Sequence, residues 1–403
     1  MSTSILYHGF GIRDYQYKRS YFAGGKIVFS IEKDPLSLRC PCCKTRHVNR
    51  RGSTLRWLQT LPIGRKHVYI ALHIPRVECL HCGIVRQIEI GFADPRRTYT
   101  KLFERYALEL SRHMTIQDVA RHLGVSWDVV KEIQKRYLSK HYSRPRLKDL
   151  KLIAIDEISI GRGHRYLTVV LDLLTGAVVF VGDGKGADAL LPFWKKLKSS
   201  RAQIDAVAMD MSPSYISAVS TNLPEATIVF DHFHIVKMFN DKLSELRRDL
   251  QREAEGTDKE VLKGTRWLLL KNPKNLRADH NEHQRLDAAL NLNKPLATAY
   301  YLKEKLRQLW LQKNKQSASA FLDDWIAQAK CAGIKMLDNF AKTLENHRAG
   351  ILAYYDYPIS TGPLEGTNNK IKTLQRQAYG FRDMEFFKLK IYALHETKYA
   401  LVG

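Results

Sequence analysis

Two acidic side chains, Asp156 and Asp210, stand in settings that suit metal-dependent chemistry. Asp156 lies within the apolar run 151–160, which predicts a buried strand, and Asp210 ends a second such run, 204–210. If the two strands are neighbours, the carboxylates repel each other unless a cation lies between them. Hard oxygen ligands favour Mg²⁺ or Mn²⁺, and paired metals can catalyse in-line phosphoryl displacement.

A third carboxylate is expected from a later helix, and Glu365 is the best candidate. Pro363 suits the first turn of a helix that carries Glu365 near its start. Three polar residues share the helix face of Glu365: Asn369, Lys372 and Arg376. Cations beside a metal-holding acid indicate a bound phosphodiester, so we predict that these three residues contact DNA. Taken singly, each acid also has an ordinary explanation as a polar strand residue, a helix N-cap or a first-turn acid.

The elements that must position the acids follow the order βββαβαβ. Strands are expected at 151–160, 165–172, 176–182, 204–210 and 226–230, with a helix at 187–197 after the third strand. This is the order of a ribonuclease H-like fold, in which the first and fourth strands are neighbours. Such neighbours would bring Asp156 and Asp210 together. Glu157 points to the other face of the sheet, because side chains alternate along a strand.

Polar residues follow the last of these strands. Asp231, His232 and His234 are candidates for an accessory catalytic role, in which they orient water or DNA. Alternatively, they cap the helix that follows. Residues from about 236 to 355 have a helical pattern almost throughout.

A cysteine cluster near the N-terminus predicts a structural zinc site. Five of the six cysteines fall within 40–82, and four of them form two Cys-x-x-Cys knuckles: Cys40, Cys43, Cys79 and Cys82. Two such knuckles can hold one tetrahedral Zn²⁺, which makes a β-rich, zinc-ribbon-like module of residues 1–95. Cys42 could replace Cys40 or Cys43 as a ligand, and buried reduced cysteines without metal remain the alternative. The basic residues around the knuckles fit either a phosphate-tracking surface or a solvated face.

Residues 115–137 have the pattern of a helix-turn-helix, which we place in a domain of residues 96–145. Thr115 can cap a first helix, Gly124 permits the sharp turn, and Ser126 can cap a second helix. The second helix of such a motif enters the major groove with its N-terminal residues leading. We therefore predict that four residues contact DNA: Ser126, Trp127, Lys131 and Lys135. The alternative is a purely structural helical hairpin.

The charge of the chain indicates a polyanionic partner. Sixty-five Lys and Arg against 41 Asp and Glu leave a net charge of +24, with a pI near 9.7. Such a field attracts nucleic acid, although charge alone does not separate DNA from RNA or an acidic protein surface. The N-terminus lacks the pattern of a signal peptide, and no apolar run approaches the roughly 20 residues of a membrane span. We expect a soluble intracellular protein without a membrane partner.

Taken together, these motifs resemble the ISL3 family of bacterial insertion-sequence transposases. The likeness rests on the cysteine knuckles, the helix-turn-helix and five further segments: 155–157, 209–212, 231–237, 364–372 and 379–382. It implies a DDE triad of Asp156, Asp210 and Glu365 that holds a divalent metal. The fold class expected is multidomain α/β, in which a ribonuclease H-like DDE domain over 146–403, with a helical insertion at about 236–355, follows the two N-terminal modules.

The function implied is that of a transposase that binds the terminal inverted repeats of an insertion sequence. Metal-activated water would free a 3′-hydroxyl at the element's end, and this hydroxyl would then attack target DNA. We expect a homo-oligomer on double-stranded DNA, in the bacterial cytoplasm and associated with the nucleoid. The alternatives are a catalytically inactive DNA-binding regulator derived from a transposase, and a nuclease that cuts without joining.

Overall fold

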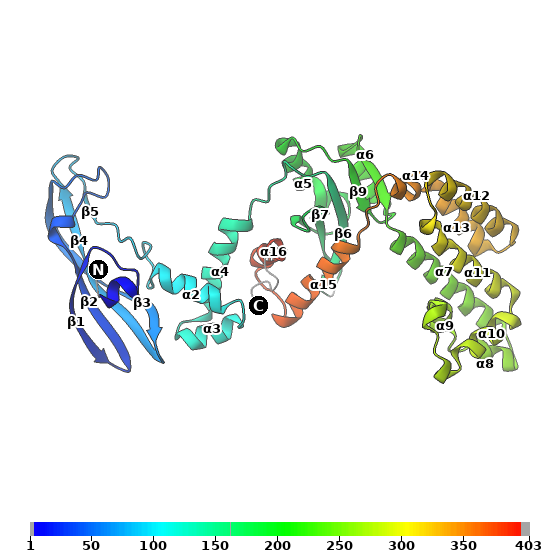
Figure 1. Cartoon of the computed structure of the whole chain (residues 1–403), viewed down its shortest axis with the longest axis horizontal. Helices are drawn as coiled ribbons and strands as arrows, with labels where there is room; N and C mark the ends of the chain where they lie inside the picture. Colours follow the sequence, from blue (N-terminus) through cyan, green and yellow to red (C-terminus); the bar gives the residue numbers. More distant parts are fainter. Residues whose placement is uncertain (1–3, 162, 396–403) are drawn as a thin grey trace. The chain divides into compact units, whose positions relative to one another are not determined.

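Two separate five-stranded sheets organise the chain. The structure, a computed structural model, describes residues 4–161 and 163–395 and divides into two units (Figure 1). The first unit contains the described residues up to Ser143 together with Leu374–Ala393. The second contains Arg144–Thr373 and the described residues after Ala393. The sequence predicts one catalytic domain over 146–403, whereas the structure groups Leu374–Ala393 with the first unit.

The sheet of the first unit consists of long antiparallel hairpins joined by one parallel pair. Its strands are β1 (Tyr15–Ala23), β2 (Lys26–Lys33), β3 (Val48–Ile63), β4 (Lys66–Cys79) and β5 (Val85–Gln87), accompanied by α1 (Ile5–His8) and η1 (Pro35–Ser37). The strand order is β1-β2-β4-β3, and β5 pairs with β4. Alternate residues of β4, including Ile70, Leu72 and Ile74, are buried, and with Leu58 of β3 they form the core of this sheet.

Three helices follow this sheet: α2 (Lys101–Leu110), α3 (Ile116–Leu123) and α4 (Trp127–Tyr142). The last two form the predicted helix-turn-helix. Thr115 caps α3 as predicted, because its hydroxyl accepts a hydrogen bond from the Asp118 N–H at 3.1 Å. Gly124 ends α3 with φ 63°, and a Cβ there would lie 2.7 Å from the His67 ring, so glycine alone fits the turn. Ser126 precedes α4 but makes no side-chain cap hydrogen bond.

The helix α16 (Met384–Tyr392) also belongs to the first unit and packs against α4. Phe386 and Leu389 of α16 lie in one apolar cluster with Leu138 and Tyr142 of α4. Burial of these side chains fixes the C-terminal helix on the second helix of the helix-turn-helix.

The sheet of the second unit has the strand order β10-β9-β6-β7-β8. Its elements are β6 (Leu152–Gly161), β7 (Arg165–Asp172), β8 (Val178–Asp183), α5 (Ala187–Ser200), β9 (Ala206–Met209), α6 (Pro213–Asn222) and β10 (Thr227–Phe230). The first three strands form an antiparallel meander, whereas β6, β9 and β10 are parallel. The predicted order βββαβαβ and the predicted pairing of the first and fourth strands are thus confirmed.

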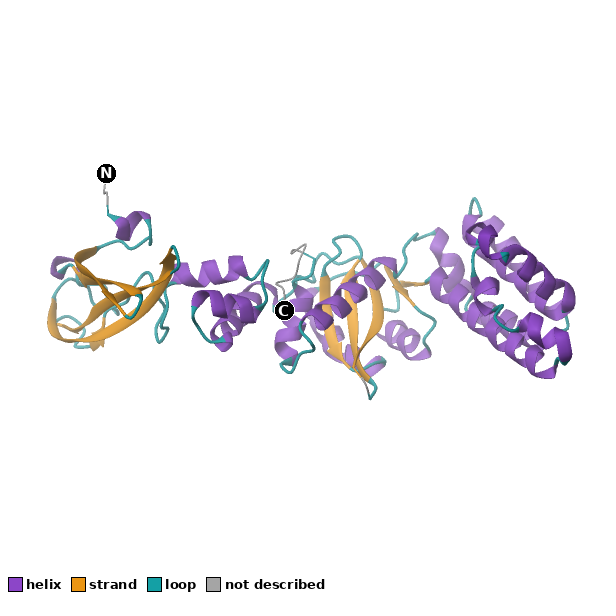
Figure 2. Cartoon of the chain, turned by 90° about the horizontal axis from the view of Figure 1, so that it is seen from below, coloured by secondary structure: helices purple, strands orange, loops and turns teal. Residues whose placement is uncertain are grey.

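A helical region follows β10 and precedes the helix α15 (Gly362–Gln377), which carries Glu365. Figure 2 shows a bundle of helices without strands at one end of the view. The helical region contains α7 (His232–Glu253), α8 (Gly256–Leu262), α9 (Arg266–Leu270), η2 (Pro273–Asn275), η3 (Ala278–His280), α10 (Glu282–Leu292), α11 (Lys294–Leu306), η4 (Arg307–Leu311), α12 (Lys315–Cys331), α13 (Lys335–Asn346), α14 (Arg348–Leu352) and η5 (Ala353–Tyr355). The rings of Phe239, Trp325 and Phe340 pack edge to face, with centroids 4.8 to 6.0 Å apart. In the described part of the chain, no helix is long and apolar enough to cross a bilayer.

The helical region is joined closely to the sheet through α14. A Cβ on Gly350 would lie 2.5 Å from the Phe230 ring of β10, so the absence of a side chain at this position allows α14 to approach the strand. Helix α7 begins at His232, a few residues earlier than the predicted helical stretch, because Asp231 at the end of β10 caps it directly.

Candidate functional site

Asp156 lies within β6 and Asp210 directly follows β9, just beyond the point where the two adjacent strands pair. Ala154 of β6 pairs with Ala208 of β9 in a parallel register, so each aspartate follows that pair by two residues. Asp210 comes directly after β9, and its Oδ1 accepts a hydrogen bond from the Ser212 N–H at 3.0 Å. The carboxyl ends of neighbouring parallel strands are the usual place for a ligand site in a sheet of this kind.

The Asp156 carboxylate is held on both oxygens. Its Oδ1 accepts a hydrogen bond from the Glu157 N–H at 2.8 Å, and its Oδ2 accepts one from Asn368 Nδ2 at 2.9 Å. Burial is the main cause that raises the pKa of Asp156 to about 6; the charges of Glu157 and Asp210 act in the same direction. The Glu157 N–H and His234 oppose this rise. A carboxylate in such a setting is stabilised by a nearby cation.

Glu157 lies on the opposite face of the sheet from Asp156, as alternation predicts. It pairs across the strands with Thr168, and the Tyr215 hydroxyl of α6 donates to its carboxylate. Tyr215 is fixed in turn by a 3.0 Å hydrogen bond with the Thr168 hydroxyl. Burial and then Asp210 raise the pKa of Glu157, whereas Tyr215 and Lys185 oppose the rise. Glu157 therefore adds negative potential beside Asp210 from the far face.

Helix α15 exposes Glu365 and buries the opposite side. Leu364 and Ile371 are fully buried and anchor the helix. The predicted DNA-contacting residues of α15 are all exposed: Asn369, Lys372 and Arg376. Within the described ranges, only the cysteine cluster brings three or more potential metal ligands within 4.8 Å of one another. Glu365 is therefore not that close to both aspartates in this structure.

Asn368 is the residue of α15 that contacts the acidic cluster, by which we mean Asp156, Glu157 and Asp210. The sequence prediction did not include Asn368. Its side chain is only 5% exposed, and its Nδ2 donates to Asp156. Its Oδ1 is buried and has no hydrogen-bond partner within the described residues. Asn368 is three residues beyond Glu365, so helical spacing places both on neighbouring positions of one side of α15. That spacing is the signal from which Asn368 could have been found.

The polar residues after β10 have distinct settings. Asp231 is 3% exposed and caps α7, because its Oδ1 accepts from the Phe233 N–H at 3.1 Å. Its Oδ2 accepts a hydrogen bond from the Thr361 hydroxyl, which ties α7 to the segment before α15. His234 acts on Asp156, where its charge opposes the rise of the pKa that burial causes. His232 lies 3.3 Å from Asp231 through Nδ1, and its accessory role stays a prediction.

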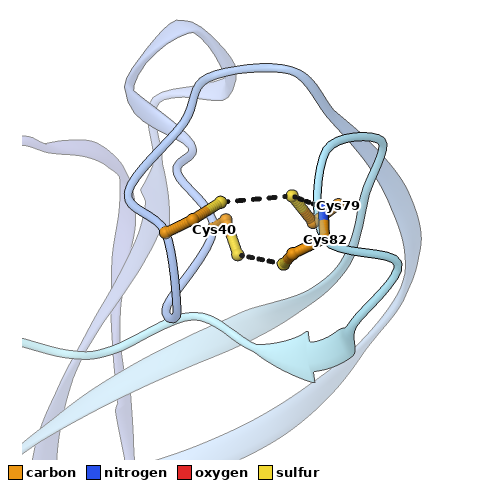
Figure 3. Close-up of side chains that lie close together, drawn as sticks. Cys40, Cys79 and Cys82 are labelled. Atoms are coloured by element: carbon orange, nitrogen blue, oxygen red, sulfur yellow. Dashed lines mark hydrogen bonds between the residues drawn. The ribbon is translucent and has the colours of Figure 1, made fainter.

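The predicted cysteines form a compact cluster in the first unit. The Sγ atoms of Cys40, Cys43, Cys79 and Cys82 all lie within 4.8 Å of one another. Figure 3 shows the labelled thiols turned toward one another from two turns, with Cys40 Sγ 3.6 Å from Cys82 Sγ. Cys43 Sγ lies 3.5 Å from Cys79 Sγ. Cys42 is exposed and is not part of this group.

Backbone amides of both knuckles point at the sulfurs. The N–H of Cys43, followed by that of Cys42, stabilises the Cys40 thiolate and lowers its pKa to about 6. Burial raises the pKa of Cys79, but the N–H groups of Cys82 and His81, each 3.4 Å from Cys79 Sγ, bring it below its ordinary value. Thiolates stabilised in this way are suited to metal coordination.

The predicted DNA-contacting residues of α4 differ in their accessibility. Ser126 is exposed, and Trp127 is 47% exposed. Lys131 and Lys135 instead form ion pairs with Asp383 at the start of α16, with N–O distances of 3.0 and 3.2 Å. Their contact with DNA stays a prediction, and it requires that these ion pairs open.

Comparisons with known proteins match the chain to transposases. Residues 153–391 match the family model DDE_Tnp_ISL3, described as "Transposase". Residues 88–138 match the "Helix-turn-helix domain of transposase family ISL3".

Two curated relatives cover most of the chain. The transposase for insertion sequence element IS1001 of Bordetella parapertussis is 32% identical over 96% of this chain and 95% of its own length. The transposase for insertion sequence element IS1557 of Mycobacterium tuberculosis (strain CDC 1551 / Oshkosh) is 30% identical over 89% of this chain and 86% of its own length. Among solved structures, the Drosophila P element transposase strand transfer complex matches at a TM-score of 0.40 and 11% identity, over 76% of this chain and 94% of that one. A likeness at that level carries no argument.

Proposed function

The chain belongs to the ISL3 family of transposases, and we propose that it cuts and joins the ends of an insertion sequence at the acidic cluster of its second sheet. The observation that carries this proposal is the parallel register of β6 and β9, in which Asp156 and Asp210 each follow the paired residues Ala154 and Ala208 by two positions. The strand order β10-β9-β6-β7-β8, with three parallel strands after a meander, supports a ribonuclease H-like assignment for this unit. We also propose the domain limits 1–95, 96–145 and 146–403 along the sequence, although Leu374–Ala393 group with the first unit in space.

The residues of the cluster fit a divalent cation such as Mg²⁺ or Mn²⁺. The donors are hard carboxylate oxygens, and burial with like charge destabilises the ionised form of Asp156. The unpartnered, buried Oδ1 of Asn368 is a further oxygen at the same place. Asp156, Asp210 and Glu365 would hold the metal, and movement of the exposed Glu365 side chain would complete the set.

Each residue has a role that follows from its contacts. The Glu157 N–H and Asn368 orient the Asp156 carboxylate, and the Ser212 N–H orients that of Asp210. When bound, divalent metal ions activate the attacking hydroxyl and stabilise the charge on the phosphate during displacement.

Cations on the exposed face of α15 add binding energy at the same site. Lys372 and Arg376 would bind phosphates further along the exposed face of α15 that carries Glu365, and Asn369 lies on the same face. His234, close to the cluster from α7, is placed to orient water or DNA. Metal together with fixed positions can carry phosphoryl transfer without a covalent protein intermediate.

The cysteine cluster fits one structural Zn²⁺. Four thiols converge, their backbone amides stabilise thiolates, and no open position is left for chemistry. Such an ion would join the turn at Cys40 and Cys43 to the turn at Cys79 and Cys82, which fixes the end of the first sheet.

DNA recognition is assigned to the first unit. The helix-turn-helix places Ser126 and Trp127 at the exposed start of its second helix, and the net charge of +24 favours phosphate contacts. We propose terminal inverted repeats and target DNA as the two duplex substrates, with a homo-oligomer assembled on them.

The experiment uses the full chain and a labelled duplex that carries the repeats flanking its coding region. With Mg²⁺, the protein should nick the repeat end and join it to a second duplex. Binding without cleavage would overturn the proposal in favour of the inactive regulator. Cleavage without joined products would favour the nuclease. Light scattering of the protein–DNA complex would test the oligomer, because a single copy on two ends would refute it.

A further inference from the structure

A cleft of about 410 Å³ lies beside α4 in the first unit, and four cationic side chains line it. Arg96 and Arg97 come from the segment before α2, whereas Lys131 and Lys135 come from α4. Lys131 and Lys135 are four residues apart, so they project from the same face of the helix. The second helix of a helix-turn-helix meets DNA with that part of its surface.

The acidic start of α16 occupies this group of cations. Asp383 Oδ2 lies 3.0 Å from Lys131 Nζ and 3.2 Å from Lys135 Nζ, and Glu385 Oε2 lies 2.6 Å from Lys135 Nζ. The side chains of Lys131, Lys135 and Asp383 are each only 25–26% exposed, so these ion pairs are partly shielded from solvent. A single carboxylate oxygen therefore bridges two lysines, as a phosphate oxygen would.

The position of Asp383 is fixed by its neighbours. Its Oδ1 accepts a hydrogen bond from the Phe386 N–H at 3.0 Å and caps α16. Phe386 in turn packs with Leu138 of α4, and the Lys131 ammonium lies 5.9 Å from its ring centroid. The acids are thus part of a docked helix rather than loose surface groups.

We propose that this cleft binds a DNA backbone phosphate, and that Asp383 and Glu385 occupy the phosphate position until DNA displaces them. The inference rests on the proposed DNA-binding function and adds an intramolecular competitor to it. Two further acids line the cleft, Asp128 and Glu132, so four cations face three carboxylates while Asp383 is present. A phosphate that replaces Asp383 meets the same four cations and two carboxylates as Asp383 does, so the two anions compete directly for one position.

The test measures affinity of the full chain for the labelled repeat duplex by fluorescence anisotropy, over about 50 to 200 mM salt. The variant is Asp383→Asn with Glu385→Gln. Asparagine keeps the cap of α16, so the change removes charge and leaves the helix end satisfied. The matched control is Glu245→Gln with Asp249→Asn, which removes two acids from exposed ion pairs on α7.

The variant Asp383→Asn with Glu385→Gln should bind the duplex roughly tenfold more tightly than the wild type, because Lys131 and Lys135 no longer have to break ion pairs with carboxylates before they contact DNA. The control, with the same change in net charge, should bind within about twofold of the wild type. In a Lys131→Gln, Lys135→Gln background, neutralising the acids should give no gain. That background should also reduce the salt slope by about 0.9 for the lost phosphate.

Equal gains in duplex affinity in the variant and the control would overturn the inference. The proposed function would still stand in that case, because the wild type binds the duplex. A gain that persists without the two lysines would overturn it as well. The single variant Glu385→Gln guards against misfolding, because Glu385 is 73% exposed and caps nothing; it should show part of the gain. If the wild type binds no duplex even at low salt, the proposed DNA recognition fails, and this inference fails with it.

Discussion

Replacing Asp156 with asparagine should stabilise the metal-free protein. Burial raises the pKa of Asp156 from its ordinary 3.8 to about 6, so the ionised form is disfavoured in the folded state. Each pKa unit corresponds to about 1.4 kcal/mol, so the buried charge costs the fold about 3 kcal/mol at neutral pH. Asparagine has one side-chain oxygen, whereas the Asp156 carboxylate accepts hydrogen bonds from two donors. The variant therefore loses one hydrogen bond, which costs about 1 kcal/mol. The net gain expected is about 2 kcal/mol.

The sign of the pH dependence provides an internal check. The folded state binds the Asp156 proton more tightly than the unfolded state, so the contribution of Asp156 to wild-type stability falls as pH rises from 3.8 to about 6 and is level above that pH. Asp156→Asn lacks this fall, and its advantage over the wild type should therefore grow across that window.

Thermal unfolding in Mg²⁺-free buffer, without a chelator that would remove the structural zinc, would measure the effect. A gain of about 2 kcal/mol should raise the melting temperature of the second unit by roughly 4–8 °C. Asp205→Asn, an exposed aspartate before the start of β9, is the matched control and should leave the melting temperature unchanged. Mg²⁺ should stabilise the wild type and not the variant. A variant less stable than the wild type at neutral pH without metal would refute the reasoning.

Three further changes test separate parts of the molecule. Cys79→Ser should lose bound zinc and unfold the first sheet, which elemental analysis and circular dichroism would detect, whereas Cys42→Ser should keep both. A wild-type protein that holds no zinc and keeps an intact first sheet would contradict the zinc site. Asn368→Ala should lower strand transfer at least tenfold with unchanged end binding, because Asp156 Oδ2 loses its donor; normal joining would make that hydrogen bond dispensable. Burial lowers the pKa of Lys390 to about 7, so the contribution of Lys390 to wild-type stability should rise between about pH 7 and 10.5. Lys390→Met should abolish that rise, and a wild-type stability that stays flat over this range in denaturant titrations would refute the prediction.

Local patterns in the sequence predicted much of the second unit. One apolar run contains Asp156 and another ends at Asp210, and the order of strands and helices leaves one common way to pair the first and fourth strands. The cysteine spacing likewise identified Cys40 and Cys79 with their partners, because a knuckle is a local turn. The cap at Thr115 followed from side-chain chemistry within one helical turn.

Contacts between distant segments were beyond the reach of such patterns. Lys135 and Asp383 are 248 residues apart, and nothing in the periodicity of α4 indicates that another helix covers its charged face. Asn368 was passed over because its partner, Asp156, belongs to a strand that only the tertiary fold brings to α15. Tertiary packing decides both cases.

Strand transfer from a pre-cut repeat end tests the central claim most directly, because it isolates joining from end recognition. With Mg²⁺, the wild type and Asp205→Asn should join the labelled end to a target duplex. Asp210→Asn and Glu365→Gln should bind that end as tightly as the wild type, because each change is nearly isosteric, yet joining should fall to background. Joining at the wild-type rate by Asp210→Asn would contradict the catalytic assignment and leave a DNA-binding regulator as the better account.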